Sequence, residues 1–231
     1  VEQIMLSPRL KEIAGAVPFG AHVADVGTDH AYLPIYLTEE GIASSVIATD
    51  IREMPLAVAR KNVAASGVKG ISLRLCDGLS GVAPDEVDTV IIAGMGGDTA
   101  AHILSSAPWL KDKNKLIILQ SMSSTEELRR FLAAEGYSVL KESCVEDSGR
   151  IYSVMTVRYE GLPREISLFE ALTGKITPGD KVSERYLSSL ACALIKKAEG
   201  TAKRADMAEE TALTLDAVEQ IRLLLGGKNA F

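Results

Sequence analysis

The sequence has too few cysteines, and too short apolar runs, for several common classes of protein. Its three cysteines, Cys76, Cys144 and Cys192, lie far apart and form no Cys-x-x-Cys pair. We therefore expect free thiols in a reducing cytoplasm rather than disulfides or a zinc site. The first residues show no signal-peptide pattern, and no apolar run approaches the roughly 18 residues of a membrane-spanning helix. These absences predict a cytoplasmic protein that requires no metal and enters no membrane.

An excess of positive charge is also lacking, since the 231 residues carry a net charge of −6. No overall basic field therefore predicts nucleic-acid binding, although a local basic patch can be sufficient. Apolar residues are abundant, at 47%, which supports a sizeable core and argues against disorder. The length allows one large domain, or one medium domain with an appendage.

Apolar segments of two different periods alternate along the first 160 residues. Strands are predicted over residues 23–26, 45–49, 71–75, 89–93 and 115–120. Helices are predicted over residues 4–17, 32–41, 56–67, 98–106 and 125–135, the first starting at Ser7-Pro8 and the last opened by an N-cap residue. Two strands without a helix between them follow, over residues 137–142 and 151–159. This order predicts an α/β fold with a doubly wound, mostly parallel seven-stranded sheet that ends in a hairpin-like pair.

The pattern changes near residues 160–163, after which only helical periods occur. Two apolar stripes with a short break between them predict an antiparallel helical pair. The stripes consist of Leu187, Leu190, Ala191, Leu194, Ile195 and Ala198, and of Leu213, Ala217, Val218, Ile221, Leu224 and Leu225. Gly200 is a candidate interruption of the first stripe. We therefore divide the chain into a domain over residues 1–162 and a helical domain over residues 163–231, which either protrudes as an arm or packs on the sheet as a lid.

The stretch Val23–Pro34 has the features of a buried strand, a tight turn and a helix N-terminus. Such a turn is expected to place free backbone N–H groups and a carboxylate at the carboxyl end of a strand. Ligands bind at this position in open α/β sheets. An ordinary strand-to-helix loop is the alternative interpretation.

Three predicted strands end in an acid and a fourth ends in a glycine-rich segment; these ends are Asp25, Asp50, Asp77 and Gly94-Met95-Gly96-Gly97. A carboxylate after the second strand can accept hydrogen bonds from both ribose hydroxyls of an adenosine. A carboxylate after the third can accept one from the exocyclic adenine amine. Gly27 and Gly78 allow the backbone to approach a ligand closely. The strand ends therefore predict an adenosine pocket.

The charge of the first turn bears on which adenosine cofactor fits. A dinucleotide site needs Gly-x-Gly-x-x-Gly, with a helix N-terminus free for the pyrophosphate. Here Asp29 stands where the second glycine would fall, and Asp25 adds another negative charge nearby. Two carboxylates oppose a pyrophosphate and attract the sulfonium and α-amino groups of S-adenosylmethionine. S-adenosylmethionine is therefore favoured over NAD.

Four segments resemble the bacterial tRNA (adenine22-N1)-methyltransferase family (TrmK), in order, over about residues 5–160. They are Leu6-Ser7-Pro8-Arg9-Leu10, Val23–Pro34, Cys76-Asp77-Gly78-Leu79 and Ala93-Gly94-Met95-Gly96-Gly97. The family combines a class I methyltransferase domain with a C-terminal helical, coiled-coil-like domain. The resemblance implies methyl transfer from S-adenosylmethionine to N1 of adenine 22 in tRNA, leaving S-adenosylhomocysteine. One departure concerns the substrate side, because Gln120-Ser121-Met122 stands where the family commonly has Gln-Pro and a variable residue.

The expected cofactor site follows from the resemblance and the strand ends; it comprises Asp25, Gly27, Thr28, Asp29, His30, Leu33, Asp50, Ile51, Asp77, Gly78, Gly94 and Met95. The candidate catalytic residues are Asp29, His30, Gly94 and Met95. Asp29 would either stabilise the positive charge that develops on the methylated base or hold the methionine amino group. His30 would orient the base or the methionine carboxylate, or serve only to start a helix.

The candidate RNA-binding residues are Tyr32, Gly96, Gly97, Lys196, Lys197, Lys203 and Arg204. Tyr32 would stack on a base or pack in the core. The segment Gly94–Gly97 would form a floor under the target base, which must be flipped out to expose its N1. The four basic residues would meet phosphates, or form a plain solvated helix face.

Other functions remain open on the sequence alone. The enzyme could methylate another RNA site or a small molecule. A non-catalytic RNA-binding protein could keep the adenosyl pocket, and a nicotinamide dehydrogenase is the most remote alternative. The oligomeric state is left between a monomer and a weak dimer.

Overall fold

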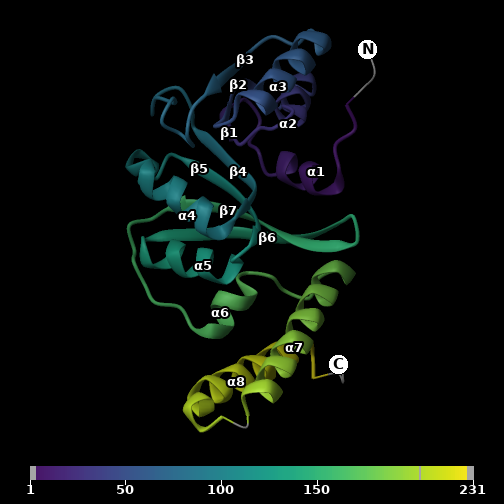
Figure 1. Cartoon of the computed structure of the whole chain (residues 1–231), viewed down its shortest axis with the longest axis vertical. Coiled ribbons are helices and arrows are strands. Elements are labelled where there is room, and N and C mark those ends of the chain that lie inside the picture. Colours follow the sequence, from purple (N-terminus) through teal and green to yellow (C-terminus); the bar gives the residue numbers. More distant parts are fainter. Residues whose placement is uncertain (1–3, 203, 228–231) are drawn as a thin grey trace.

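A computed structural model describes residues 4–202 and 204–227 of the chain. Its centre is a seven-stranded sheet with the strand order β3-β2-β1-β4-β5-β7-β6 (Figure 1). The strands are β1 (Ala21–Val26), β2 (Ala43–Asp50), β3 (Ile71–Leu75), β4 (Thr89–Gly96), β5 (Leu116–Ser123), β6 (Tyr137–Asp147) and β7 (Arg150–Tyr159). The first five strands run parallel, and β7 lies antiparallel between β5 and β6. The predicted seven-stranded, doubly wound sheet is confirmed.

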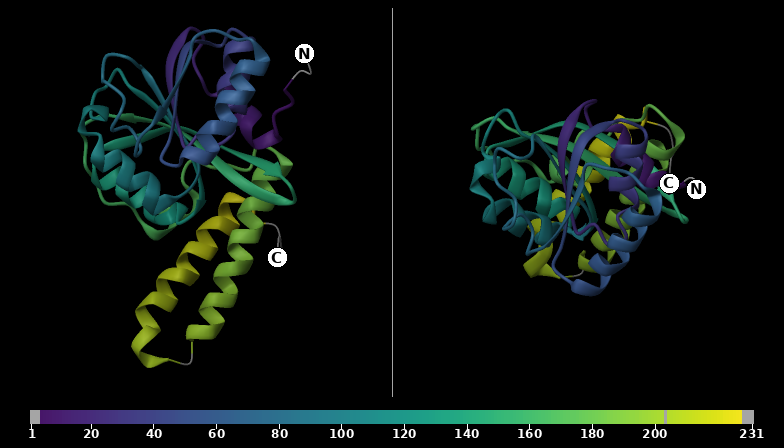
Figure 2. Two further views of the ribbon diagram at one scale, coloured as in Figure 1. Left: turned by 45° about the horizontal axis from the view of Figure 1, so that its top comes forward. Right: turned by 90° about the horizontal axis from the view of Figure 1, so that it is seen from above.

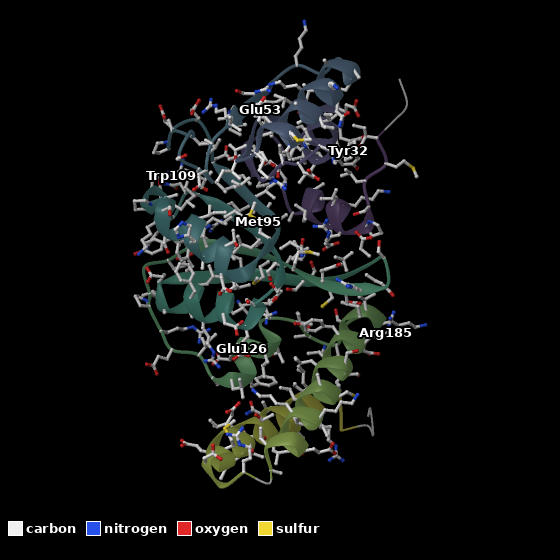
Figure 3. The ribbon with its side chains drawn as sticks, viewed as in Figure 1. Tyr32, Glu53, Met95, Trp109, Glu126 and Arg185 are labelled. Carbon is white, nitrogen blue, oxygen red and sulfur yellow. The ribbon has the colours of Figure 1, made fainter. Side chains whose placement is uncertain are left out.

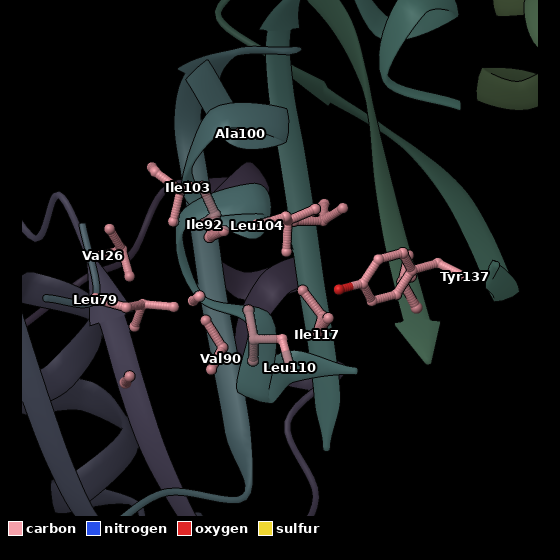
Figure 4. Close-up of a cluster of buried hydrophobic side chains, with 14 of the residues drawn as sticks. Val26, Leu79, Val90, Ile92, Ala100, Ile103, Leu104, Leu110, Ile117 and Tyr137 are labelled. Atoms are coloured by element: carbon pink, nitrogen blue, oxygen red, sulfur yellow. The ribbon is translucent and has the colours of Figure 1, made fainter. Parts of the chain in front are cut away.

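Helices cover both faces of the sheet and bury both sets of strand side chains. The α-helices are α1 (Pro8–Gly15), α2 (Tyr32–Glu39), α3 (Glu53–Ser66), α4 (Gly97–Ser106), α5 (Thr125–Ala134), α6 (Leu168–Thr173), α7 (Lys181–Thr201) and α8 (Ala208–Leu224), with 3-10 turns η1 (Pro108–Leu110) and η2 (Ala205–Met207). Successive strand residues point to opposite faces. Val23 and Ile91 accordingly pack in the cluster of α1 and α2, whereas Val26 and Ile92 pack with α4 and α5 (Figure 4). A parallel sheet covered on both sides has this doubly apolar character.

Three strands extend at their carboxyl ends by three or more residues beyond the side-chain pattern. β4 continues through the glycine-rich segment to Gly96, β5 extends to Ser123, and β6 extends to Asp147. Gly94 has a positive φ of 76°, and the register shifts there before Met95 pairs with Ser121. Strand pairing uses main-chain hydrogen bonds, whereas the prediction from sequence uses the alternation of side chains. The glycine-rich end of β4 has no such alternation, so its extension could not be predicted.

The predicted helix starts agree with the structure at α1 and disagree at α5. The Ser7 hydroxyl accepts a hydrogen bond from the Leu10 N–H at 3.4 Å, as expected of an N-cap, although α1 is shorter than predicted. The expected N-cap of α5 is wrong. Ser124 has a φ of 53° and makes no capping hydrogen bond, because its hydroxyl donates to Asp98 at 3.2 Å.

The C-terminal helical region is present, and it has the form of an arm. Helices α7 and α8 form an antiparallel hairpin that extends away from the sheet (Figure 2). Leu187, Ala191 and Ile221 are fully buried between the arm's helices and α6. The predicted interruption at Gly200 is wrong, since α7 continues to Thr201. A glycine inside a helix is unfavourable by only about 1 kcal/mol, which apolar packing readily outweighs. The division at residues 162 and 163 stays a prediction.

A buried ion pair connects this C-terminal region to the sheet. Arg129 of α5 donates to the Glu142 carboxylate of β6 at 2.6 Å, and their side chains are 3% and 0% exposed. The Arg129 guanidinium also donates to the carbonyls of Ala171 and Leu172 in α6, at 2.7 and 2.8 Å. The Lys175 N–H donates to the other oxygen of Glu142 at 3.0 Å. The segment after residue 162 is therefore built into the core at its base, and removing all of it would expose a buried charge.

Candidate active site

A cavity of about 520 Å³ lies at the carboxyl ends of β1, β2 and β4, within the size range of cofactor sites. The twelve residues predicted for the cofactor site all line it, together with Tyr32. Tyr32 and Met95 lie in the sheet-bearing part of the molecule, away from the arm that carries Arg185 (Figure 3). Because parallel strands end at the same edge of a sheet, their terminal residues converge there although they are far apart in sequence.

The turn after β1 holds its backbone donors in internal hydrogen bonds. The N–H groups of Gly27 and Thr28 both donate to the carbonyl of Thr49, at 2.8 and 2.9 Å. The Asp29 N–H donates to the Asp50 carboxylate at 3.3 Å. The prediction that this turn presents free N–H groups is therefore wrong for Gly27, Thr28 and Asp29. A pyrophosphate would find none of these three donors available, so the geometry argues further against a dinucleotide.

Gly27 is required at the centre of this turn. Its φ is +72°, a conformation that L side chains rarely adopt, and a Cβ there would overlap the Met95 side chain. The Met95 methyl group therefore lies directly over Gly27. This contact brings the end of β4 against the turn after β1 and closes one side of the cavity.

The segment after the turn is strained. Asp29 has a φ of 53° and the fully buried Ala31 a φ of 58°, and for alanine this conformation is unfavourable by roughly 1–2 kcal/mol. The Asp29 carboxylate lies 3.2 Å from His30 Nδ1, and its side chain is 59% exposed. The rings of His30 and Tyr32 lie 5.6 Å apart. Strain of this kind is found where a functional site holds residues in place.

Asp25 is one of two buried carboxylates in the cavity, with 5% of the residue exposed. Burial raises its pKa from 3.8 to about 6, the Thr28 hydroxyl opposes this rise, and the charge of Asp50 adds to it. The Thr28 oxygen is itself outside hydrogen-bonding geometry with any described residue. Asp25 is therefore a desolvated negative charge that a cationic ligand would stabilise.

Asp50 and Asp77 differ in how their carboxylates are held. Asp50 is 4% exposed and accepts the N–H of Arg52 at 2.8 Å in addition to that of Asp29. Asp77 follows β3 in an exposed position, and its carboxylate accepts no hydrogen bond within the described part of the chain. Asp50 is thus preorganised to accept hydrogen bonds in a fixed direction, whereas Asp77 can adjust to an amine donor.

The glycine-rich end of β4 serves two purposes. Gly94 and Met95 line the cavity, and the Gly94 N–H donates to Gln120 Oε1 at 3.1 Å. Gly96 and Gly97 lie outside the cavity lining. A Cβ at Gly97 would overlap the backbone of Ser124, so this glycine permits α4 to pack against the start of α5. Of the segment Gly94–Gly97 that was predicted to form a floor under the base, only Gly94 and Met95 therefore line the cavity.

Several cavity residues were not predicted as cofactor ligands. They are Arg9, Leu10, Val26, Thr49, Arg52, Cys76, Ala93, Thr99, His102 and Ile103. Thr99, His102 and Ile103 lie on one face of α4 at the spacing of a helix stripe, which is the one signal that could have found them. Arg9 Nη1 donates to Gln120 Oε1 at 2.6 Å, a contact between residues too far apart in sequence for any local pattern to reveal.

The predicted basic edge of the arm is largely neutralised by its neighbours. Lys197 pairs with Glu210 at 2.9 Å, and Arg204 pairs with Asp206 at 2.8 Å. Lys203 lies outside the described residues. Lys196 is exposed on α7 and makes no ion pair with another described residue. Of the four, Lys196 is therefore the residue best placed to meet a phosphate.

Residues 4–202 and 204–227 contain neither a metal-binding cluster nor a membrane-spanning helix. No cluster of three His, Cys, Asp or Glu side chains is arranged to hold a metal ion. None of the helices in these ranges combines the length and apolar character needed to cross a membrane.

Known proteins share both the sequence and the architecture. Residues 6–155 match a family described as a methyltransferase domain. The tRNA (adenine(22)-N(1))-methyltransferase of Bacillus subtilis (strain 168) is 38% identical over 159 residues, which are 67% of this chain and 66% of that protein, just under two thirds of its length. The solved structure of B. subtilis TrmK has a TM-score of 0.80 at 29% identity, covering 96% of this chain and 97% of that one.

A second relative extends the likeness over the whole of its chain. A candidate tRNA (m1A22) methyltransferase from Streptococcus pneumoniae has a TM-score of 0.81 at 32% identity, covering 96% of this chain and 100% of that one. The same protein has been solved in complex with S-adenosyl-L-methionine, with a TM-score of 0.74. The similarity therefore includes the helical arm as well as the sheet.

Proposed function

This chain belongs to the methyltransferase-domain family, within the tRNA (adenine22-N1)-methyltransferases, and from that premise we propose that it transfers a methyl group from S-adenosylmethionine to N1 of adenine 22 in tRNA. The observation that carries the proposal is the cavity with its four carboxylates, Asp25, Asp29, Asp50 and Asp77, at one edge of the sheet. We place the enzyme in the cytoplasm, where its tRNA substrate would be found.

The residues present fit S-adenosylmethionine better than a dinucleotide. Asp50 can accept hydrogen bonds from the ribose hydroxyls, and Asp77 can accept one from the adenine amine. The buried charge of Asp25 favours a cationic group, and the N–H groups of Gly27, Thr28 and Asp29 are already occupied by internal hydrogen bonds. When bound, S-adenosylmethionine supplies a methyl group activated by a positively charged sulfur.

Methylation at N1 requires little proton transfer from the protein. N1 of adenine carries a lone pair and needs no general base for its attack. The base becomes positively charged as the bond forms, so a nearby carboxylate lowers the energy of the transition state. Asp29 is an exposed carboxylate in the turn after β1 and is the candidate for this role; binding of the methionine amino group is its alternative role. The rings of His30 and Tyr32 have centroids 5.6 Å apart and are tilted by 38°, and they offer a surface on which a flipped base could stack.

Replacing Asp29 by asparagine is expected to lower kcat for tRNA methylation by about tenfold to a hundredfold. Asparagine tolerates the left-handed backbone at this position, whereas alanine would add strain to the loss of charge. Initial rates with saturating tRNA give kcat, and calorimetry gives the affinity for S-adenosylmethionine. A fall in kcat alone indicates charge stabilisation of the base, and a fall in affinity indicates a contact with the amino group. An unchanged kcat and an unchanged affinity would remove Asp29 from the mechanism.

Replacing Lys196 by glutamate is expected to raise the KM for tRNA several-fold and to reduce the salt dependence of binding by about one counterion. Its side chain is exposed on α7. Lys113→Glu is the matched control, because Lys113 is exposed just before the amino end of β5, at the opposite edge of the sheet from the cavity. Equal effects of the two substitutions would show that only net charge matters and would exclude the arm from specific binding.

The direct test of the proposed function uses purified protein, S-adenosylmethionine with a labelled methyl group and an unmodified tRNA transcript. Mass spectrometry of the nucleosides, followed by mapping of the labelled fragment, is expected to place 1-methyladenosine at position 22. Label at another nucleotide would contradict the substrate position. No label in tRNA at all would contradict the function.

A further inference from the structure

A second cavity, of about 350 Å³, lies where the end of β5, the start of β7 and helix α7 meet. Its lining consists of Ser121, Met122, Thr125, Arg150, Ile151, Tyr152, Ser153 and Tyr186. None of the residues predicted from the sequence to bind cofactor or RNA is among them. The cavity is large enough for a small organic ligand, and it lies between the sheet and the base of the arm.

The second cavity lies beside the first at the same edge of the sheet. Met95, which lines the first cavity, is paired across the sheet with Ser121, which lines the second. Arg9 lies between the two. Its side chain lines the first cavity, and its guanidinium carbon is 5.8 Å from the centre of the Tyr152 ring in the second. A chain of nucleotides entering one cavity would therefore pass the other.

The second cavity differs from the first in its acidic residues. Four carboxylates line the first cavity, whereas no acidic residue lines the second. Arg150 is exposed at the start of β7 and makes no ion pair within the described ranges. The rest of the lining consists of two tyrosines, three Ser or Thr side chains, and the apolar Met122 and Ile151. The hydroxyls of Ser121 and Thr125 bond to each other at 2.7 Å. Aromatic rings stack on bases, and a guanidinium binds phosphate, so this set suits a nucleotide rather than a second cationic ligand.

We propose that the second cavity binds the nucleotide adjacent to the target adenosine of the tRNA, with its base against Tyr152 and its phosphate against Arg150. This inference rests on the proposed function. The target base itself must reach the methyl donor in the first cavity. The Met95–Ser121 pair and Arg9 lie between the first cavity and the second, so the second cavity is left for a neighbouring nucleotide. Extruding a base requires unstacking it from its neighbours. Stacking the neighbour on Tyr152 stabilises the extruded arrangement, and Ser121, which departs from the family pattern, helps to shape this subsite.

The proposal is tested with Tyr152→Ala and Arg150→Ala in the full chain. Tyr152→Ala is expected to raise the KM for tRNA by roughly tenfold, and Tyr152→Phe to keep it near the wild-type value, since the ring supplies the stacking. Arg150→Ala is expected to raise the KM several-fold and to lower the salt dependence by about one counterion. Arg158→Ala, further along the same strand, is the control and is expected to leave the KM unchanged. The affinity for S-adenosylmethionine is expected to stay unchanged in all four variants.

Two results would overturn the proposal. One is a wild-type KM for tRNA in both Tyr152→Ala and Arg150→Ala. The other is an equal loss of S-adenosylmethionine affinity in Tyr152→Ala, which would mean that the ring only holds Arg9 in place.

A crosslinking experiment does not depend on how well the variants fold. Transcripts carrying 4-thiouridine on the 5′ or the 3′ side of the target are irradiated with the wild-type protein. A crosslink to the peptide that contains Arg150–Ser153 is expected from one of them, and its absence from both would overturn the proposal. Failure of the proposed function is separately visible, because the wild-type protein would then label no tRNA.

Discussion

Replacing Arg129 by methionine is expected to lower the free energy of unfolding by about 3–5 kcal/mol. The substitution removes one partner of a buried ion pair and leaves the Glu142 charge without compensation in a site where its side chain is 0% exposed. It also removes the donors to the carbonyls of Ala171 and Leu172. A typical domain is stable by only about 5–15 kcal/mol. Urea unfolding followed by circular dichroism measures the loss.

Two further variants test whether the loss of stability comes from the unpaired charge of Glu142. Arg130→Ala removes the neighbouring pair with Glu126, whose side chains are 41% and 33% exposed, and should change the free energy by less than about 1 kcal/mol. Combining Arg129→Met with Glu142→Leu removes both charges and should recover much of the lost stability, because the cost lies in the unpaired charge. A loss in the double variant as large as in Arg129→Met would show that the bonds to α6 matter most.

Replacing Asp25 by asparagine is expected to act in the opposite direction and to stabilise the ligand-free protein at neutral pH. Its pKa in the folded protein is raised from 3.8 to about 6 by burial. Well below pH 3.8 the carboxyl is protonated in both folded and unfolded chains. As the pH rises from about 4 to 6 the unfolded chain loses its proton first, so stability falls, by about 3 kcal/mol in total at 1.36 kcal/mol per pH unit. Asparagine is neutral throughout and avoids this loss.

The same substitution is expected to weaken binding of S-adenosylmethionine by tenfold or more, because it removes a desolvated negative charge beside a cationic ligand. Unfolding free energies measured from pH 4 to pH 8 should diverge between wild type and Asp25→Asn as the pH rises. Calorimetry at pH 7 should show the lost affinity. Asp77→Asn is the matched control, since this exposed carboxyl follows another strand at the same edge and should leave stability within about 0.5 kcal/mol. Parallel stability curves for wild type and Asp25→Asn would contradict the burial argument.

The substitutions of Arg129 and Asp25 both change the free-energy cost of a buried charge, the first raising it and the second removing it. Arg129 compensates a buried charge, so its loss destabilises the protein. Asp25 is a buried charge that we propose binds a cationic ligand, so its neutralisation is expected to stabilise the free protein and to impair binding. Such a loss of stability at a functional residue is expected where binding selects for charge rather than for packing.

The sequence by itself determined the sheet and the position of the cavity that we propose holds the cofactor. Apolar periodicity located the strands and helices, and Asp25, Asp50 and Asp77 stood at strand ends that any parallel sheet brings to one edge. These features depend on local pattern and on a general rule of topology.

Only the tertiary structure decided which of these groups are free to act. The N–H groups of Gly27 and Thr28 are occupied because strand register places the Thr49 carbonyl against them. The second cavity exists because β5, β7 and α7 meet, and the arm is anchored because Arg129 and Glu142 meet within the core. Hydrogen-bond partners and cavities depend on contacts between segments distant in the chain, and no local period carries that information.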